Sequence, residues 1–206
     1  MEQKIPDNKN NKPLEHYRQQ FGKLTPEAMA MRSGFVYDRE AFAFRMRFLG
    51  REVAMSYPDM RLSYVTGEAI TRPDILILLS RALIEGLGKA GGGKFLAYSE
   101  VPWGNVYLQQ FRGRCLMRLA FGFGYDLEKF CRACEALGGV ACSGGDKGYD
   151  IAFLDDLCVR LLIWAGDDEF PPSAQILFSD NFPAMFTAED MAVVGDILIS
   201  AMKSIK

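Results

Sequence analysis

The sequence predicts a single α+β domain in which a mainly antiparallel sheet packs on helices. Short segments of alternating apolar and polar residues follow one another closely between residues 42 and 66, as in an antiparallel meander. Segments with helical spacing and capping residues come in separate stretches, which favours α+β over a parallel α/β arrangement. No internal repeat and no Pro- or Ser-rich linker divides the chain. We therefore expect a polar N-terminal arm with a short helix at 1–24 and one domain at 25–206.

The first elements are two helices followed by a run of strands. A short helix is expected at 14–21, after the polar start of the chain. The segment 25–34 begins with Thr and Pro and ends with Gly, which are the residues that suit a helix start, its first turn and its end. Period-two alternation of Phe and Met with Arg predicts a strand at 42–48. Further strands are expected at 52–57 and 61–66, on either side of a Pro-Asp turn.

The middle of the chain changes to helical signals. Thr71 followed by Arg-Pro-Asp is a capping pattern, so we expect a helix to begin there. The run 75–87 is apolar almost all round and predicts a well-buried helix. It ends in a glycine-rich loop at 88–93, and a strand is expected at 95–101.

The C-terminal half contains the remaining helices and a hairpin. Apolar residues recur at helical spacing over 108–119, and Asp126 caps the helix that follows. The segment 150–164 reads as two strands joined by an Asp-Asp turn, and one more strand is expected at 175–178. Thr187 opens the last helix with a capping sequence.

Composition excludes several classes of function. The chain has 206 residues, with 24 Lys+Arg against 26 Asp+Glu and a net charge of -2, which is not the footprint of a nucleic-acid binder. The longest aliphatic run, Ile75–Leu79, is far below the length of a membrane-spanning helix, and the N-terminus lacks the apolar core of a signal peptide. We expect a cytoplasmic protein with no nucleic-acid or membrane partner. Its five cysteines, an odd number, fit reduced thiols better than a disulfide framework.

The segment richest in potential chemistry is Trp164–Pro172, with consecutive carboxylates between a glycine and two prolines. Neighbouring carboxylates can ligate a hard cation such as Mg²⁺ or Mn²⁺, and a desolvated one can act as a general acid. We expect metal ligation by Asp167 and Glu169, and a glycine-flanked Asp146 directed into the same cavity. The alternative is a solvated acidic turn at a strand end. The candidate ligand-binding residues are Asp146, Trp164, Asp167, Asp168 and Glu169.

Other reactive residue types have structural interpretations. Cys131 and Cys134 with Cys142 lack a fourth ligand at a recognised interval, so no iron–sulphur cluster is expected and packing is the preferred role. Histidine-based catalysis is not expected, because the single histidine, His16, lies in the polar N-terminal region. The arginines on one predicted helix could meet an anionic ligand or form a solvated face. These are Arg112, Arg114 and Arg118.

One motif resembles the signature of a family of bacterial and archaeal domains of unknown function. It runs from Trp164 through Gly166-Asp167 and Glu169-Phe170-Pro171-Pro172 to Phe178. The resemblance covers roughly residues 25–200. Many members come from anaerobes, and some are fused to a four-cysteine iron–sulphur segment, which residues 1–24 cannot form because they contain no cysteine. The resemblance implies an accessory domain near anaerobic redox or one-carbon metabolism. The aspartate expected after the Leu-Phe pair is replaced here by Ser179.

Three functional hypotheses follow. The first is an accessory or small-ligand-binding domain with a pocket around Asp146 and 167–169. The second is a divalent-metal-dependent hydrolase that uses the same carboxylates as ligands. The third is an interaction module that forms a homodimer through an apolar surface. The sequence does not identify the small molecule or protein partner.

Overall fold

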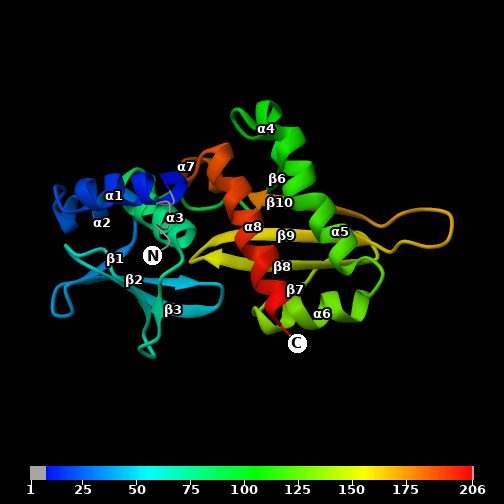
Figure 1. The fold of residues 1–206 in the computed structure, drawn as a ribbon, viewed down its shortest axis with the longest axis horizontal. Coiled ribbons are helices and arrows are strands. Elements are labelled where there is room, and N and C mark those ends of the chain that lie inside the picture. Colours follow the sequence, from blue (N-terminus) through cyan, green and yellow to red (C-terminus); the bar gives the residue numbers. More distant parts are fainter. Residues whose placement is uncertain (1–7, 206) are drawn as a thin grey trace, which may run out of the picture. The chain divides into compact units, whose positions relative to one another are not determined.

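The computed structural model describes residues 8–205, and their contacts divide them into two compact units. The first unit takes the described residues up to Met46 together with Glu52–Gly88. The second takes Arg47–Arg51 and everything described from Lys89 onward. Arg47–Arg51 is the tip of the hairpin formed by β2 (Ala43–Phe48) and β3 (Arg51–Ser56) (Figure 1), so the second unit includes a short piece from early in the chain.

The first unit combines antiparallel strand pairs with helices. β5 pairs with β4, β4 with β3, and β1 with β2. Phe21 and Phe44 lie in its core as an edge-to-face pair with ring centroids 6.0 Å apart. Its other elements are α1 (Asn8–Phe21), α2 (Pro26–Ser33), β1 (Val36–Asp38), β4 (Leu62–Tyr64), β5 (Ala69–Ile70) and α3 (Pro73–Ile84).

The second unit contains a larger antiparallel sheet. β8 pairs with β9, β9 with β10, and β10 with β6, while β7 pairs with β8 on the other side. A 3₁₀ turn at Tyr98–Glu100 follows β6, and a π-helical turn at Arg112–Leu116 joins α4 to α5. The elements are β6 (Phe95–Ala97), α4 (Gly104–Phe111), α5 (Met117–Phe123), α6 (Leu127–Ala136), β7 (Val140–Ala141), β8 (Lys147–Leu154), β9 (Leu157–Trp164), β10 (Ser173–Ser179), α7 (Phe182–Met185) and α8 (Ala188–Ser204).

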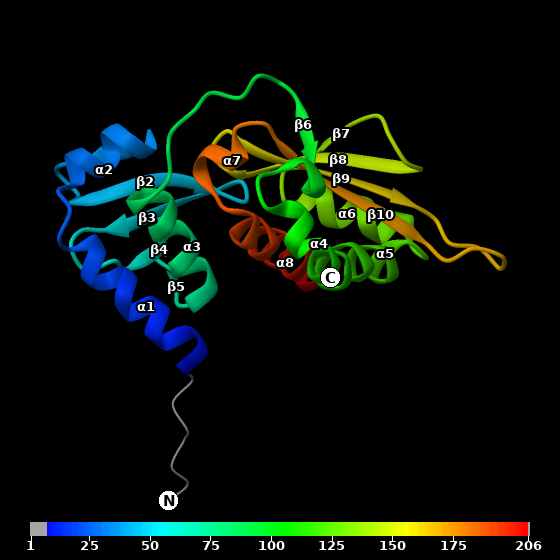
Figure 2. The ribbon, with the colours of Figure 1, turned by 90° about the horizontal axis from the view of Figure 1, so that it is seen from above.

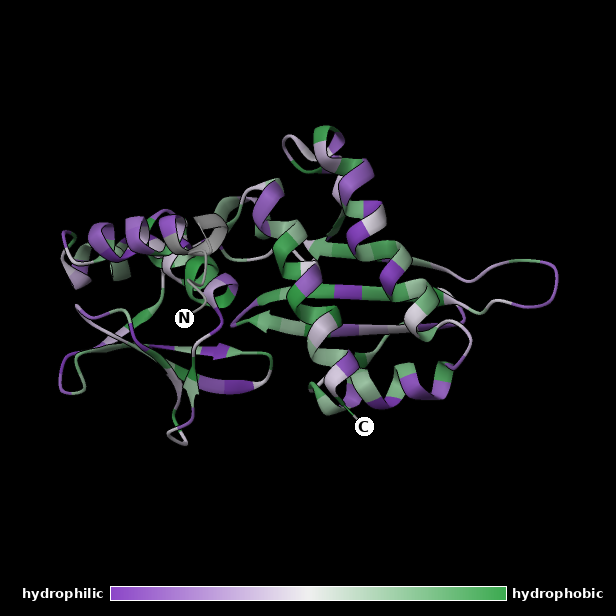
Figure 3. Ribbon diagram, in the orientation of Figure 1, coloured by the Kyte–Doolittle hydropathy of each residue, from purple (hydrophilic) through white to green (hydrophobic). Residues whose placement is uncertain are grey.

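Helices α5, α6 and α8 cover one face of this sheet (Figures 1 and 2). Side chains alternate across β9, so Val159, Leu161 and Ile163 are buried while Arg160 is only partly buried. Most residues of β9 and β10 are hydrophobic, as their colours in Figure 3 show. The buried residues of β9 therefore alternate along the strand, as expected for a strand that packs on helices.

The α+β class and most elements are confirmed. Thr25 accepts a hydrogen bond from the Ala28 N–H at 3.3 Å, and Gly34 ends α2 with a φ of 79°. Asp126 caps α6 by accepting a bond from the Lys129 N–H at 2.9 Å. Thr187 forms a capping box with Asp190 at the start of α8. The hairpin formed by β8 and β9 lies where alternating residues and the Asp-Asp turn predict it.

Several boundaries differ from the prediction. The first helix begins at Asn8 rather than 14, and residues 1–7 of the expected arm lie outside the described part of the chain. Phe42 is a turn residue with a φ of 49° and is 64 % exposed, so β2 begins one residue later. The N-cap of α3 is Arg72, without a side-chain hydrogen bond, rather than Thr71.

The strand expected at 95–101 is wrong over its second half. It ends at Ala97, whose N–H donates to the Glu100 carboxylate at 2.6 Å, and the chain turns into the 3₁₀ segment. A side-chain acceptor three residues ahead replaces a partner strand for this N–H. The helix expected at 108–119 extends from Gly104 to Phe123 and contains the π-helical turn. The strands β1, β5 and β7 are too short for periodicity to reveal.

No helix within residues 8–205 combines the length and apolar character needed to cross a bilayer.

Candidate functional site

The loop between β9 and β10 runs from Ala165 to Pro172 and is anchored at its base. The Gly166 N–H donates to the Gly124 carbonyl at 3.0 Å. Both glycines lie against Pro172, because a Cβ on Gly124 or on Gly166 would lie 2.3 or 2.5 Å from its ring. Neither position therefore accepts a side chain without movement. Beyond this anchor the loop extends past the ends of the strands of its own unit (Figure 1).

The tip of the loop is a closed turn built by Asp167. The Asp167 Oδ1 accepts hydrogen bonds from the Phe170 N–H at 2.7 Å and the Glu169 N–H at 2.9 Å. The Asp167 N–H donates to the Phe170 carbonyl at 2.9 Å. The backbone bonds from Phe170 and Glu169 lower the pKa of the Asp167 carboxyl below its usual value. Asp167 thus acts as the side chain that closes the turn.

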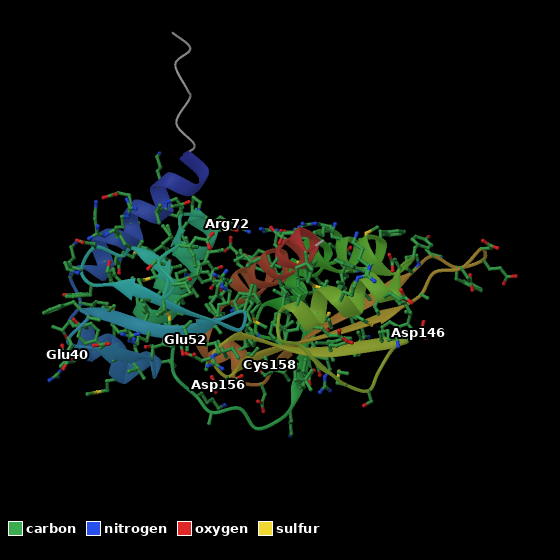
Figure 4. All side chains as sticks on the ribbon, turned by 90° about the horizontal axis from the view of Figure 1, so that it is seen from below. Glu40, Glu52, Arg72, Asp146, Asp156 and Cys158 are labelled. Atoms are coloured by element: carbon green, nitrogen blue, oxygen red, sulfur yellow. The ribbon has the colours of Figure 1, made fainter. Side chains whose placement is uncertain are left out.

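Asp146 joins the glycine-rich segment before β8 to the base of this loop. Its Oδ2 accepts a hydrogen bond from the Ala165 N–H at 2.8 Å, and its own N–H donates to the Ile163 carbonyl at 2.9 Å. Gly145 has a φ of 63°, and a Cβ there would lie 2.6 Å from the same carbonyl, so this close approach requires glycine. Figure 4 shows Asp146 at the opposite end of the β8–β9 hairpin from Asp156 and Cys158.

The pairing of β8 with β9 brings Asp146 to the base of the loop that carries the other candidates, but the candidate residues do not all share a role. Asp146 and Asp167 each bind backbone N–H groups, whereas Asp168 and Glu169 are exposed and Trp164 is half-buried. Among residues 8–205, no group of three or more His, Cys, Asp or Glu side chains is positioned to hold a metal ion. The exposed tip is hydrophilic in Figure 3. Its exception is Phe170, which is 67 % exposed.

The cysteines of the second unit are free thiols, and burial holds four of them in the protonated form. Desolvation raises the pKa of Cys115 to about 12 and that of Cys158 to about 11. It also raises the pKa of Cys134 and of Cys142. Cys115 and Cys134 are fully buried, as expected for packing residues. At neutral pH these four groups are not thiolate nucleophiles.

The predicted arginine patch is partly an intramolecular ion-pair network. Arg114 Nη2 lies 2.8 Å from the Asp196 carboxylate on α8, and Arg118 also pairs with that carboxylate. The arginine hydrogen bonds lower the pKa of Asp196, against the opposing effect of its burial. Arg112 is exposed on the π-helical turn.

A second feature, which the sequence did not indicate, is a pocket of about 150 Å³ between the end of β6, the edge of β10 and the wall formed by α4 and the π-helical turn. The sequence predicted the strands at 95–101 and 175–178 and the helix at 108–119 that contribute to it, but not the pocket, whose formation depends on β6 ending early. We call this pocket and the adjoining edge of β10 the edge groove. It is lined by Ala97, Tyr98, Ser99, Leu108, Phe111, Leu116, Gln175, Ile176 and Leu177.

Comparison with known proteins identifies a family but no activity. No protein of curated function and no solved structure matches the chain. The family described as "Domain of unknown function (DUF3786)" matches residues 25–201, which include the β9–β10 loop, the edge groove and most of both units. The match covers far more than half of the sequence, and the chain therefore belongs to the DUF3786 family.

Proposed function

We propose that this protein is an accessory domain that binds a protein partner through the β9–β10 loop. The observation that carries the proposal is the closed turn at Asp167, which presents an exposed Phe170 between acidic and proline residues. The resemblance described above extends the proposal to a cytoplasmic role near anaerobic redox or one-carbon metabolism.

The turn is organised before any partner arrives. Its hydrogen bonds from Glu169 and Phe170 to Asp167, together with the anchor of Gly166 on Gly124, hold the loop in one conformation. Pro171 and Pro172 stiffen the return to β10. Binding through such a loop loses less conformational entropy than binding through a flexible one.

The chemistry of the tip indicates the kind of surface that fits it. A solvent-exposed aromatic ring is a frequent anchor of protein interfaces when it enters an apolar hollow. Asp168 and Glu169 are exposed beside Phe170, so the complementary surface carries Lys or Arg around that hollow. Because the tip projects outward, it suits insertion into a partner better than enclosure of a small ligand.

The metal-dependent hydrolase is the competing hypothesis. It needs carboxylate oxygens that converge on an ion, whereas Asp167 directs an oxygen at two N–H groups of its own turn. Titration calorimetry with Mg²⁺ and Mn²⁺ distinguishes the two. The partner-binding proposal predicts no heat of binding, and a heat that disappears in Asp167→Asn would favour the hydrolase.

The direct test places a photocrosslinking phenylalanine analogue at Phe170 in cells that produce the protein. Phe42 is a matched control, because it is also a phenylalanine in a turn and is 64 % exposed against 67 % for Phe170. We expect a discrete adduct from position 170 that is absent from position 42 and weakened by Asp168→Lys with Glu169→Lys. Identical adducts from both positions, or an adduct insensitive to charge reversal, would contradict the proposal.

A further inference from the structure

We propose that the outer face of the helical run from α4 to α5 is an interface between two copies of this chain, which form a closed two-fold dimer. The proposal is separate from the β9–β10 loop. It rests on the apolar area of this face, on its lack of ionisable side chains and on the order of the residues along it.

The helices α4 and α5 follow one another in a single run, interrupted only by the π-helical turn (Figure 1). One side of this run packs on the rest of the second unit and is fully buried. Its buried side chains recur every four residues, at Phe111, Cys115, Leu119 and Phe123. The other side of the run faces solvent.

Five exposed residues on that other side follow one another at spacings of three or four. They are Val106, Gln110, Gly113, Met117 and Phe121. Residues at these spacings share one face of a helix, and we call this set the outer stripe. None of the five is ionisable, so no charge has to be desolvated when the stripe is covered.

Exposed apolar side chains concentrate along this part of the chain. Among the described residues, six of the thirteen large hydrophobic side chains that are exposed lie within 103–125. They are Trp103, Val106, Tyr107, Met117, Phe121 and Tyr125. Together they expose about 700 Å², above the roughly 300–600 Å² of the largest apolar patch on a typical monomer. A stable interface buries about 800 Å² on each partner, so the area matches what a dimer needs.

The order of residues along the outer stripe makes it complementary to itself, as a two-fold interface requires. Gly113 lies at the middle of the stripe, and a Cβ there would meet no atom within 4 Å, so a second helix can approach its backbone closely. When two stripes cross antiparallel at Gly113, Val106 of one copy lies toward Phe121 of the other. A shorter side chain then faces a longer one at both ends of the contact.

Arginines flank the outer stripe without belonging to it. Arg114 and Arg118 pair with the Asp196 carboxylate of their own chain. Arg112 is exposed beside Gly113, so a dimer brings the two Arg112 side chains to the same rim, where they repel each other. Added salt therefore strengthens a dimer of this kind, whereas it weakens the binding of an acidic partner.

The test measures the molar mass of the full-length protein by sedimentation equilibrium up to about 500 µM chain. We expect a monomer–dimer transition with a Kd of about 10–100 µM, and nothing larger, because a two-fold interface closes on itself. Val106→Glu and Phe121→Glu should each weaken dimerisation at least about tenfold, since a symmetric interface contains each substitution twice. Val140→Glu is the matched control: Val140 belongs to the same unit, lies on β7 outside the stripe, and is 69 % exposed against 63 % for Val106. Circular dichroism checks that each variant is folded.

Two further measurements test the geometry and the occupant. Arg112→Gln should strengthen dimerisation about two- to fivefold, and so should raising the salt concentration. A photocrosslinking phenylalanine analogue at Phe121, in cells that produce the protein, should give an adduct of twice the chain mass.

A protein that stays monomeric at about 500 µM would overturn the proposal. So would a dimer that Val140→Glu weakens as much as Val106→Glu does, or one that weakens as salt is added. A photocrosslink from Phe121 to a different protein alone would show that the occupant is not a second copy.

Discussion

Two glycines of one helical run, Gly104 and Gly113, should respond in opposite ways to the same substitution. A Cβ on Gly104 would lie 1.8 Å from the Tyr98 carbonyl oxygen and 3.0 Å from Val101 Cγ2. A Cβ on Gly113 would meet no atom within 4 Å. Alanine at Gly104 therefore tests the steric cost of an added methyl group, and alanine at Gly113 tests helix propensity without that cost. Both glycines lie in the helical wall of the edge groove.

The magnitude for Gly104→Ala follows from the separation that must change. The Cβ–oxygen distance has to widen from 1.8 Å to at least 3.0 Å. Tyr98 cannot yield freely, because its hydroxyl bonds to the Ala188 carbonyl and its ring stacks on Phe111. Overpacking of this kind costs about 2–4 kcal/mol of unfolding free energy. At about 3 °C per kcal/mol for a chain of this size, Tm should fall by roughly 6–12 °C.

Gly113→Ala should instead raise the unfolding free energy by about 0.5–1 kcal/mol, because alanine loses less backbone entropy than glycine in a helix. Urea unfolding followed by tryptophan fluorescence is the assay. The two tryptophans of the chain, Trp103 and Trp164, both belong to the second unit, so the signal reports on the unit that contains the substitutions.

A Gly104→Ala variant within about 0.5 kcal/mol of the wild type would refute the steric argument. A Gly113→Ala variant as unstable as Gly104→Ala would also refute it. Both variants add the same methyl group, and only the one at position 104 meets other atoms.

Three further predictions concern other parts of the molecule. Asp146→Ala should lower the unfolding free energy by about 0.5–1.5 kcal/mol by leaving the Ala165 N–H without its acceptor, and Asp146→Asn, which keeps an oxygen there, should lower it less in the same urea titration. The pKa of Asp167 is lowered in the folded protein, so the closed turn is favoured above the ordinary aspartate pKa and is lost as pH falls through the lowered value. An NMR titration should show the Phe170 amide resonance moving in that acidic range. A resonance shift centred above the ordinary aspartate pKa would contradict this prediction. Cys115 and Cys134 should react with a thiol reagent only after unfolding, because both are fully buried and their pKa values are raised, and rapid labelling of either in native buffer would show that the helices open.

The expected single domain at 25–206 remains a prediction that unfolding experiments can test. Far-UV circular dichroism reports on both units, whereas tryptophan fluorescence reports on the second. Coincident urea transitions by the two probes would indicate one cooperative domain. A fluorescence transition displaced from the dichroism transition would indicate two.

Local signals predicted much of the fold because the relevant chemistry is close in sequence. The caps at Thr25, Asp126 and Thr187 each act on an N–H three residues ahead, so the sequence contains both partners. The β8–β9 hairpin could also be predicted from the sequence, because apolar and polar residues alternate on either side of a short turn.

The parts that escaped prediction depend on partners distant in sequence. Nothing local shows that Asp146 accepts from Ala165, because the two meet only when β8 pairs with β9. The edge groove was hidden for the same reason, as β6 is separated from β10 by most of the second unit. The acidic loop was identified from composition alone, and the turn that Asp167 closes could not be distinguished from a ligand site without its hydrogen bonds.

The short segment Arg47–Arg51 has a consequence for how this protein can be divided. Phe48 pairs with Leu154 and packs its ring on Phe153, with centroids 5.3 Å apart. The Arg47 N–H donates to the Asp155 carboxylate at 2.8 Å. A fragment cut before Lys89 would lack these partners and would leave a hydrophobic strand end uncovered. The two units are defined by contacts between residues and not by a single cut in the sequence. A gene fusion, domain exchange or expression fragment that divides the chain at one position would therefore separate the end of β2 from the sheet that it completes.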